Sequence, residues 1–297
     1  MPHPHHVALG SQVLLALIIA STAAVYLRGW LRLRSTSLNV IPVWQAGSFL
    51  LGMSLIWTAV ASPIAALDRE LLTVHMLQHL LLMTIAPPLI WLGRPVMAFL
   101  HGLPRPLAHK VIDPLLQAAP VQRLGRVLAQ PAFCWLAAAA ALLGWHIPAV
   151  FTLALQSETW HMVEHASFLV AGLLFWWPVV QPWPSAAKWP ELSIILYLFL
   201  ATLPCDILSG FLVFCDRVVY PVYFSSSHPF GLSALEDQQC AGALMWTCVT
   251  VVYLVAGAVL TMKLLSPAIS HHDTLAHSDL RAGAMRKSIP QGAAGAL

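Results

Sequence analysis

The sequence predicts an all-α membrane protein, a bundle of seven transmembrane helices with the amino terminus outside and the carboxyl terminus in the cytoplasm. Of the 297 residues, 59% are hydrophobic and only 9% are charged, whereas soluble domains carry about a quarter charged residues. This composition excludes a water-soluble domain of this size. The net charge of +3 says little by itself. We expect membrane lipid, and no nucleic acid, around the chain.

Seven stretches provide the roughly 20 apolar residues that a helix needs to cross the hydrocarbon. In chain order we expect these helices at residues 7–27, 41–61, 70–92, 131–155, 159–181, 190–214 and 237–262.

Charged residues mark the ends of the first four stretches. Arg28 follows the first stretch, the segment Asp68–Glu70 separates the second from the third, and Arg94 follows the third. The connection of residues 93–130 is rich in Pro and Arg and precedes the fourth. We expect this connection to contain a short helix at the membrane interface.

Charged residues and a loop also separate the later stretches. Glu158 separates the fourth stretch from the fifth, Lys188 lies between the fifth and the sixth, and a loop of residues 215–236 precedes the seventh. From residue 266 onward the chain is polar and rich in Ala, Gly and His, which is typical of disorder. The expected organisation is a polytopic membrane domain of residues 1–265 and a disordered cytoplasmic tail of residues 266–297.

Basic residues set the orientation. Arg28, Arg32 and Arg34 follow the first stretch, and the connection of residues 93–130 and the tail also carry a basic excess. Cytoplasmic loops of membrane proteins are enriched in Lys and Arg. The amino terminus is therefore expected outside and the carboxyl terminus inside.

Two pairs of histidines lie within the apolar stretches. His75 and His79 are one helical turn apart in the third stretch, and His161 and His165 are one turn apart in the fifth, with Glu164 beside them. Polar side chains at membrane depth are costly and indicate function. The four-residue spacing also places each pair on one helix face.

Other polar and sulfur side chains are expected at the same depth in the membrane as these histidines. With a rise of about 1.5 Å per residue, five helices place a polar or sulfur side chain roughly 10–13 Å below the outer surface. These side chains are His79, His146, His165, Asp206 beside Cys205, and Met245.

Imidazole, thioether and thiolate ligands suit copper, and imidazole also suits zinc and iron. Carboxylates could orient the imidazoles or bind the metal themselves. We therefore expect one copper ion in the outer half of the bundle. The candidate ligands are His75, His79, His146, His161, His165, Met76, Met83, Met245, Glu164, Asp206, Cys205 and Asp237. His3, His5 and His6 are expected to form a loose accessory site or none.

Three other interpretations stay open at this point. A membrane cytochrome would use two facing histidines, such as His79 and His165, as axial haem ligands. The sequence His161-Met-Val-Glu164-His165 also fits the H-x-x-E-H signature of a zinc protease. A metal-free scaffold would use these residues for helix packing alone.

Several motifs resemble one known family. His75-Met-Leu-Gln-His79, followed by Met83 and Gly93-Arg94-Pro95, resembles the third-span signature of the CtaG family of cytochrome c oxidase assembly proteins. Trp145-His146-Ile147-Pro148 and Asp237-Gln238-Gln239 resemble later motifs of that family. The resemblance runs in order over about residues 40–262.

The resemblance implies a multi-pass protein of the bacterial inner membrane. It implies a copper-binding chaperone, not an enzyme, that supplies copper to the CuB centre of a haem–copper oxidase. The implied partners are the catalytic subunit of the oxidase and a periplasmic copper donor.

Overall fold

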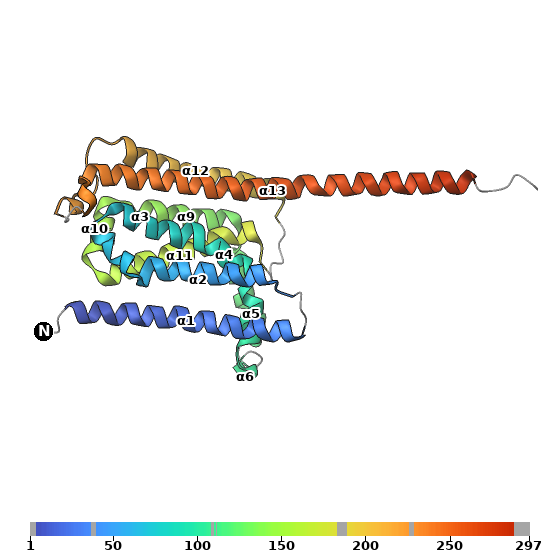
Figure 1. The fold of residues 1–297 in the computed structure, drawn as a ribbon, viewed down its shortest axis with the longest axis horizontal. Coiled ribbons are helices and arrows are strands. Elements are labelled where there is room, and N and C mark those ends of the chain that lie inside the picture. Colours follow the sequence, from blue (N-terminus) through green and yellow to red (C-terminus); the bar gives the residue numbers. More distant parts are fainter. Residues whose placement is uncertain are drawn as a thin grey trace, which may run out of the picture. The chain divides into compact units, whose positions relative to one another are not determined.

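The computed structural model describes residues 4–36, 40–107, 110, 112–182, 189–225 and 229–287 (Figure 1). This part of the chain contains helices and no strand. The principal helices are α1 (Pro4–Thr36), α2 (Val43–Ala61), α3 (Leu72–Leu80), α4 (Ala86–Leu92), α9 (Pro131–Trp145), α11 (Glu158–Val180), α12 (Glu191–Phe214) and α13 (Ala234–Lys287). The shorter elements are η1 (Pro63–Arg69), η2 (Leu81–Ile85), α5 (Pro95–Gly102), α6 (Arg105–Leu107), α7 (Asp113–Gln117), α8 (Ala119–Leu128), α10 (Pro148–Gln156), η4 (Pro221–Ser225) and η5 (Pro229–Gly231).

The chain divides into two compact units, Met1–Tyr253 and Leu254–Leu297. The first unit contains the helical bundle, and α13 continues through the second unit to Lys287. The division expected from the sequence, a membrane domain of residues 1–265 and a disordered tail of residues 266–297, stays a prediction.

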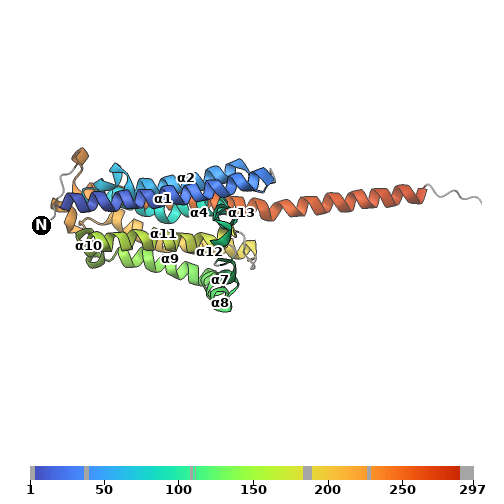
Figure 2. The ribbon, with the colours of Figure 1, turned by 90° about the horizontal axis from the view of Figure 1, so that it is seen from below.

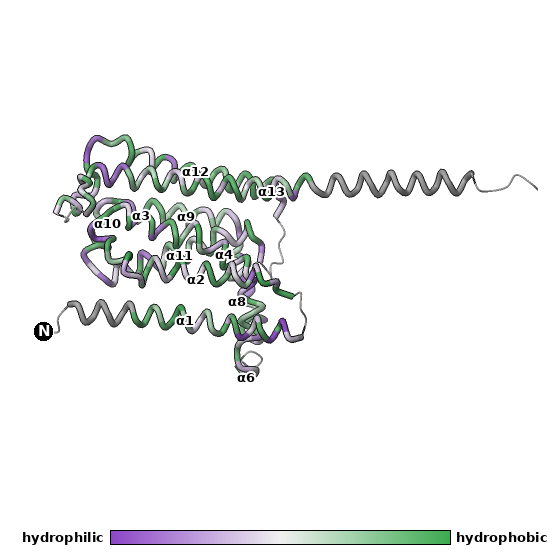
Figure 3. Tube along the Cα trace, viewed as in Figure 1, coloured by the Kyte–Doolittle hydropathy of each residue, from purple (hydrophilic) through white to green (hydrophobic). Residues whose placement is uncertain are grey.

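The expected multi-pass helical architecture is confirmed. Six helices within the described residues are long and apolar enough to cross a membrane, and α8 with α9 makes a seventh candidate if this bent pair is one span. Hydrophobic residues follow most of the length of α12 (Figure 3). The helices α3, η2 and α4 together form one of these candidates, Leu72–Leu92. The orientation of the termini stays a prediction.

The expected fourth helix of residues 131–155 is wrong as a single element. Helix α9 ends at Trp145, and a separate helix, α10, begins at Pro148. Ile147 between them is extended, with φ −64° and ψ 124°, because a residue before proline is disfavoured in the α region. His146 therefore lies at a helix end rather than in the middle of a span.

The connection before α9 carries the expected short helix, together with others. Helix α8 meets α9 at a bend of 66°, and Figure 2 shows α7 and α8 at the end of the bundle where α9 begins. None of the described side chains of α8 is buried. Its exposed faces suit the membrane interface, where we expected this helix.

The third span changes its helical type in the middle. Pro87 and Pro88 have no backbone N–H, so they cannot donate to the carbonyls four residues earlier. The preceding residues Leu81–Ile85 form a π-helical turn, a feature frequent at functional sites. Gly172 of α11 packs here, since a Cβ atom on it would lie 2.6 Å from the carbonyl oxygen of Met83. The absence of a side chain at Gly172 thus allows α11 to approach the third span closely.

We expect Gly172→Ala to separate α11 from this turn, because the added methyl group meets backbone that cannot move aside. Overpacking of this kind costs about 1–3 kcal/mol of unfolding free energy. Thermal unfolding of the purified protein in detergent measures the loss. The matched control is Gly144→Ala on α9, where the added Cβ meets no described atom within 4 Å. Equal unfolding temperatures for the two variants would contradict the packing argument.

Candidate metal centre

Two imidazoles and one carboxylate meet between α3 and α11. The Nε2 atoms of His75 and His79 lie 3.5 and 3.4 Å from the same oxygen, Oε1 of Glu164. The exposed fractions of the three residues are 0%, 5% and 0%. One ligand atom from each lies within 4.8 Å of the other two. The four-residue spacing on α3 places both rings on the face that α11 covers.

A second carboxylate adjoins this group. Nε2 of His161 lies 3.3 Å from Oδ2 of Asp68 in η1, and the His161 ring stacks on the His75 ring with centroids 5.5 Å apart. Asp68, His75 and His161 form a second set of ligand atoms within 4.8 Å of one another. In the sequence, Asp68 lies in a connection between spans and was not expected among the ligands. Its position seven residues before His75 was the available signal.

His165 lies at the edge of the cluster. Its ring centroid is 4.2 Å from that of His161, 6.0 Å from that of His79 and 6.4 Å from that of His75. All four histidines of the two sequence pairs therefore meet at one place.

The cluster contains polar atoms that are buried without a hydrogen bond to any described residue. They are both ring nitrogens of His75 and of His79, both carboxylate oxygens of Glu164, and the Nε2 atoms of His161 and His165. Nearly all buried polar groups in proteins have a hydrogen-bond partner, and an unsatisfied one costs about 1–3 kcal/mol. A bound cation would satisfy the carboxylate oxygens and one nitrogen of each ring that faces it, since a neutral imidazole has a single free lone pair. The residues present therefore fit a metal ion held by nitrogen and oxygen ligands.

Aromatic side chains cover the cluster. The hydroxyl of Tyr223 donates to the carbonyl of Asp68 at 2.8 Å, and the hydroxyl of Tyr220 donates to the carbonyl of His146 at 3.0 Å. Phe151 lies between them and the imidazoles, with its ring centroid 4.9 Å from His75 and 4.1 Å from Tyr220. Burial raises the pKa of both tyrosines, so their hydroxyls remain donors. These three residues were not expected at the site from the sequence.

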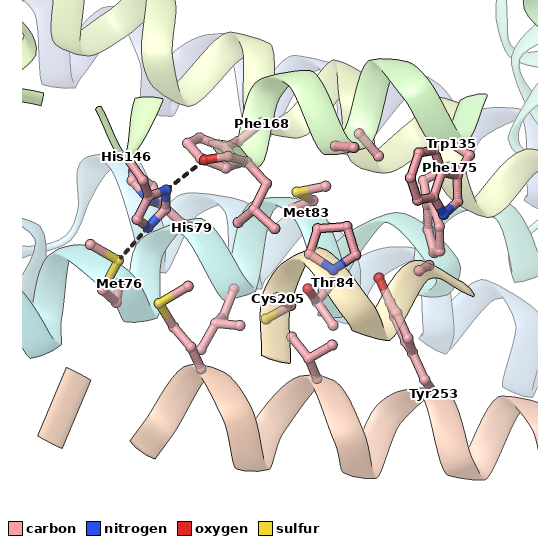
Figure 4. Close-up of a pocket in the computed structure, with 18 residues that line it drawn as sticks. Met76, His79, Met83, Thr84, Trp135, His146, Phe168, Phe175, Cys205 and Tyr253 are labelled. Atoms are coloured by element: carbon pink, nitrogen blue, oxygen red, sulfur yellow. Dashed lines mark hydrogen bonds between the residues drawn. The ribbon is translucent and has the colours of Figure 1, made fainter. Parts of the chain in front are cut away.

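The predicted sulfur ligands lie on the other side of His79. They line a small cavity together with two of the imidazoles (Figure 4). The potential metal ligands that line this cavity are Met76, His79, Met83, His146, Cys205 and Met245.

A larger cavity of about 960 Å³ borders the cluster on its opposite side. Its lining includes Asp68, His161 and His165 together with apolar residues of α1, α2 and α11.

The structure gives Asp237 a different role from the expected one. Its Oδ2 accepts from the backbone N–H of Leu72 at 2.6 Å, and its Oδ1 accepts from the N–H and the hydroxyl of Thr73 at 3.1 and 2.6 Å. The first N–H groups of a helix have no partner within that helix. Asp237 therefore caps α3 and holds the start of the histidine helix.

Asp206 does not belong to either set of clustered ligand atoms among the described residues. The neighbouring Cys205 is buried, with its Sγ 3.6 Å from the hydroxyl oxygen of Ser209. The amino-terminal histidines His3, His5 and His6 lie outside the side chains that the structure describes.

Comparison with known proteins identifies relatives of the chain. A family model described as cytochrome c oxidase caa3 assembly factor (Caa3_CtaG) matches residues 24–266. The chain is 26% identical over 230 residues to "Uncharacterized protein Mb0105" of Mycobacterium bovis, a match that covers 75% of this chain and 34% of the relative. It is 25% identical over 251 residues to "Uncharacterized protein ML1998" of Mycobacterium leprae, covering 77% and 36%. The chain thus spans about a third of the length of these curated relatives. No solved structure matches it.

We expect Asp237→Ala to lower the unfolding free energy by about 1–2 kcal/mol, the usual cost of losing a helix cap. Metal bound per folded molecule should stay unchanged, because the carboxylate contacts α3 backbone rather than imidazoles. Thermal unfolding and elemental analysis of the same preparations measure both quantities. The control is Asp216→Ala, at an exposed position in the loop before α13. Loss of bound metal without a lower unfolding free energy would contradict this role and indicate that Asp237 is a metal ligand.

Proposed function

Since this chain belongs to the cytochrome c oxidase caa3 assembly factor family, we propose that it is a copper-binding membrane chaperone that supplies the CuB centre of a haem–copper oxidase. The oxidase is then its partner as the acceptor of copper, through the catalytic subunit that carries CuB. No catalysis is required of the chain itself.

The observation that carries this proposal is the cluster of His75, His79 and Glu164. Three converging ligand atoms lie within 4.8 Å of one another in a fully buried place. A buried carboxylate needs an opposite charge nearby, and a cation between the imidazoles and Glu164 supplies it. Packing alone does not require polar atoms that lack hydrogen-bond partners.

Copper is the metal that this environment favours. Imidazole and carboxylate ligands suit several divalent metals, but thioethers select copper, and the thioether of Met76 lines a cavity together with His79 of the cluster. Met76 is fully buried, with an exposed fraction of 0%. The ion is cargo, so it must also leave, and imidazole ligands can be exchanged one at a time.

We place the cluster near the extracytoplasmic side. His75 and His161 lie close to the first residues of α3 and α11, whereas Arg28, Arg32 and Arg34 lie near the last residues of α1. By the positive-inside rule these arginines face the cytoplasm. A periplasmic copper donor would then reach the cluster from outside. The large cavity lined by His161 and His165 offers the ion a path along α11, and membrane lipid surrounds the bundle of this bacterial inner-membrane protein.

The geometry argues against the zinc-protease interpretation of His161, Glu164 and His165. In that mechanism the two histidines bind one metal, and the glutamate is free to act as a base. Here Glu164 faces His75 and His79 of α3, while His161 faces Asp68. The carboxylate is therefore placed to balance charge at the α3 imidazoles.

We expect His79→Ala and Glu164→Gln to weaken copper binding at least about tenfold, since even outer partners of metal ligands contribute this much. The oxidase made in cells with either variant should contain less CuB. Copper per purified molecule and the copper content of the oxidase are the two measurements. The control is His101→Ala, which removes an exposed histidine of α5.

Equal copper in the wild type and all three variants would show that the cluster of His75, His79 and Glu164 does not bind the copper. A Soret band in the purified protein would indicate a membrane cytochrome instead. Normal oxidase assembly with His79→Ala and Glu164→Gln would indicate a metal-free scaffold.

A further inference from the structure

The small cavity beside His79 has a chemistry different from that of the cluster. Its volume is about 40 Å³, whereas a single water-sized probe needs about 10–15 Å³. The potential metal ligands that line it are neutral: thioethers, a thiol and imidazoles. Neither Glu164 nor Asp68 belongs to its lining. The carboxylate side and the sulfur side thus lie on two sides of one residue, His79.

His146 presents an unprotonated nitrogen to this cavity. Its Nδ1 lies 2.7 Å from the carbonyl oxygen of Leu142. A carbonyl only accepts hydrogen bonds, so Nδ1 carries the hydrogen, and in a neutral ring Nε2 then carries a lone pair. The Leu142 carbonyl therefore fixes both the tautomer and the direction of the ring.

A thioether faces that lone pair. Nε2 of His146 lies 3.2 Å from Sδ of Met76 (Figure 4), and the exposed fractions of the two residues are 5% and 0%. A neutral His146 provides no proton for a hydrogen bond between these atoms. Two electron-pair donors thus point toward each other in a buried place.

The same two atoms suit one soft metal ion. At metal–ligand distances of about 2.0 Å to nitrogen and about 2.3 Å to sulfur, tetrahedral ligands lie about 3.5 Å apart. The observed separation is a few tenths of an ångström shorter, and the flexible methionine side chain can provide that movement. Met245 and Cys205 line the same cavity and are further soft donors.

We propose that Met76 and His146 form a second metal position, selective for monovalent copper, beside the cluster of His75, His79 and Glu164. This inference rests on the proposed function in that copper is the cargo of both positions. The neutral sulfur position suits Cu(I), whereas the imidazoles and the carboxylate of the cluster suit either Cu(I) or a divalent ion. His79 is the shared residue, because its Nε2 faces Glu164 and its ring lines the sulfur cavity. Monovalent copper passes between the positions by ligand exchange, with no change of oxidation state.

The test titrates the purified full-length protein with Cu(I) under anaerobic conditions against a coloured Cu(I) chelator, and separately with Zn(II). Met76→Leu removes the sulfur at nearly constant volume. We expect it to lower Cu(I) affinity at least about tenfold and to leave Zn(II) binding unchanged. Glu164→Gln should lower Zn(II) affinity and weaken Cu(I) binding at the cluster, while Cu(I) at the Met76 and His146 position keeps its sulfur neighbours. The matched control is Met53→Leu, at a buried methionine of the α2 core that lines the larger cavity but not the sulfur cavity. An equilibrium titration does not depend on the path of the ion.

X-ray absorption of the Cu(I)-loaded protein provides a direct signature. The wild type and Met53→Leu should show a sulfur neighbour at about 2.3 Å, and Met76→Leu should have fewer sulfur neighbours. Cu(I) affinity and spectra that are the same for Met76→Leu and Met53→Leu would overturn the second position. If Glu164→Gln still lost Zn(II) in that case, the cluster of the proposed function would stand. Failure of the wild type to bind either ion would overturn both.

Discussion

The buried carboxylate of Glu164 among imidazole rings is the constraint on which the rest of this protein depends. An ionised carboxylate in an apolar interior is tolerated only beside a positive charge or several hydrogen-bond donors. Here its oxygen faces the Nε2 atoms of His75 and His79 at 3.5 and 3.4 Å. Those nitrogens can hold a proton or share a metal ion with it. Helices α3 and α11 must therefore stay in one register, because a shift of either would leave a charge buried alone.

Several contacts far apart in the sequence maintain that register. Asp237 of α13 caps the first turn of α3, and Gly172 of α11 lies against the π-helical turn that follows α3. Tyr223 connects the loop before α13 to the backbone of Asp68. Each contact fixes one end or one side of the histidine helix. The scaffold is thus built around the position of two imidazole rings.

The placement of donors on either side of His79 is suited to a protein that must bind a metal and then release it. A carboxylate holds a cation through charge, whereas thioethers and neutral imidazoles hold it through soft, exchangeable bonds. Phe168 stacks on His79 with ring centroids 4.0 Å apart, so the ring between the two sides is held by packing as well as by Glu164. The chain belongs to a family of oxidase assembly factors, and the copper delivery that we propose for it would use both properties, binding and transfer.

The sequence alone determined the helical membrane architecture and most of the cluster, because apolar length and four-residue spacing are local properties. It placed His79 and His165 in one layer, and the pairs His75 with His79 and His161 with His165 each on one helix face. The structure joins these four rings with Glu164. What only the tertiary structure decided is which groups face each other. Asp68 joins the cluster through the path of η1, and Asp237 turns away from it to cap α3. His146 meets Met76 because Pro148 ends the helix there and the Leu142 carbonyl directs the ring. Spacing along a helix specifies a face, but the partner of that face depends on how helices distant in the sequence pack together.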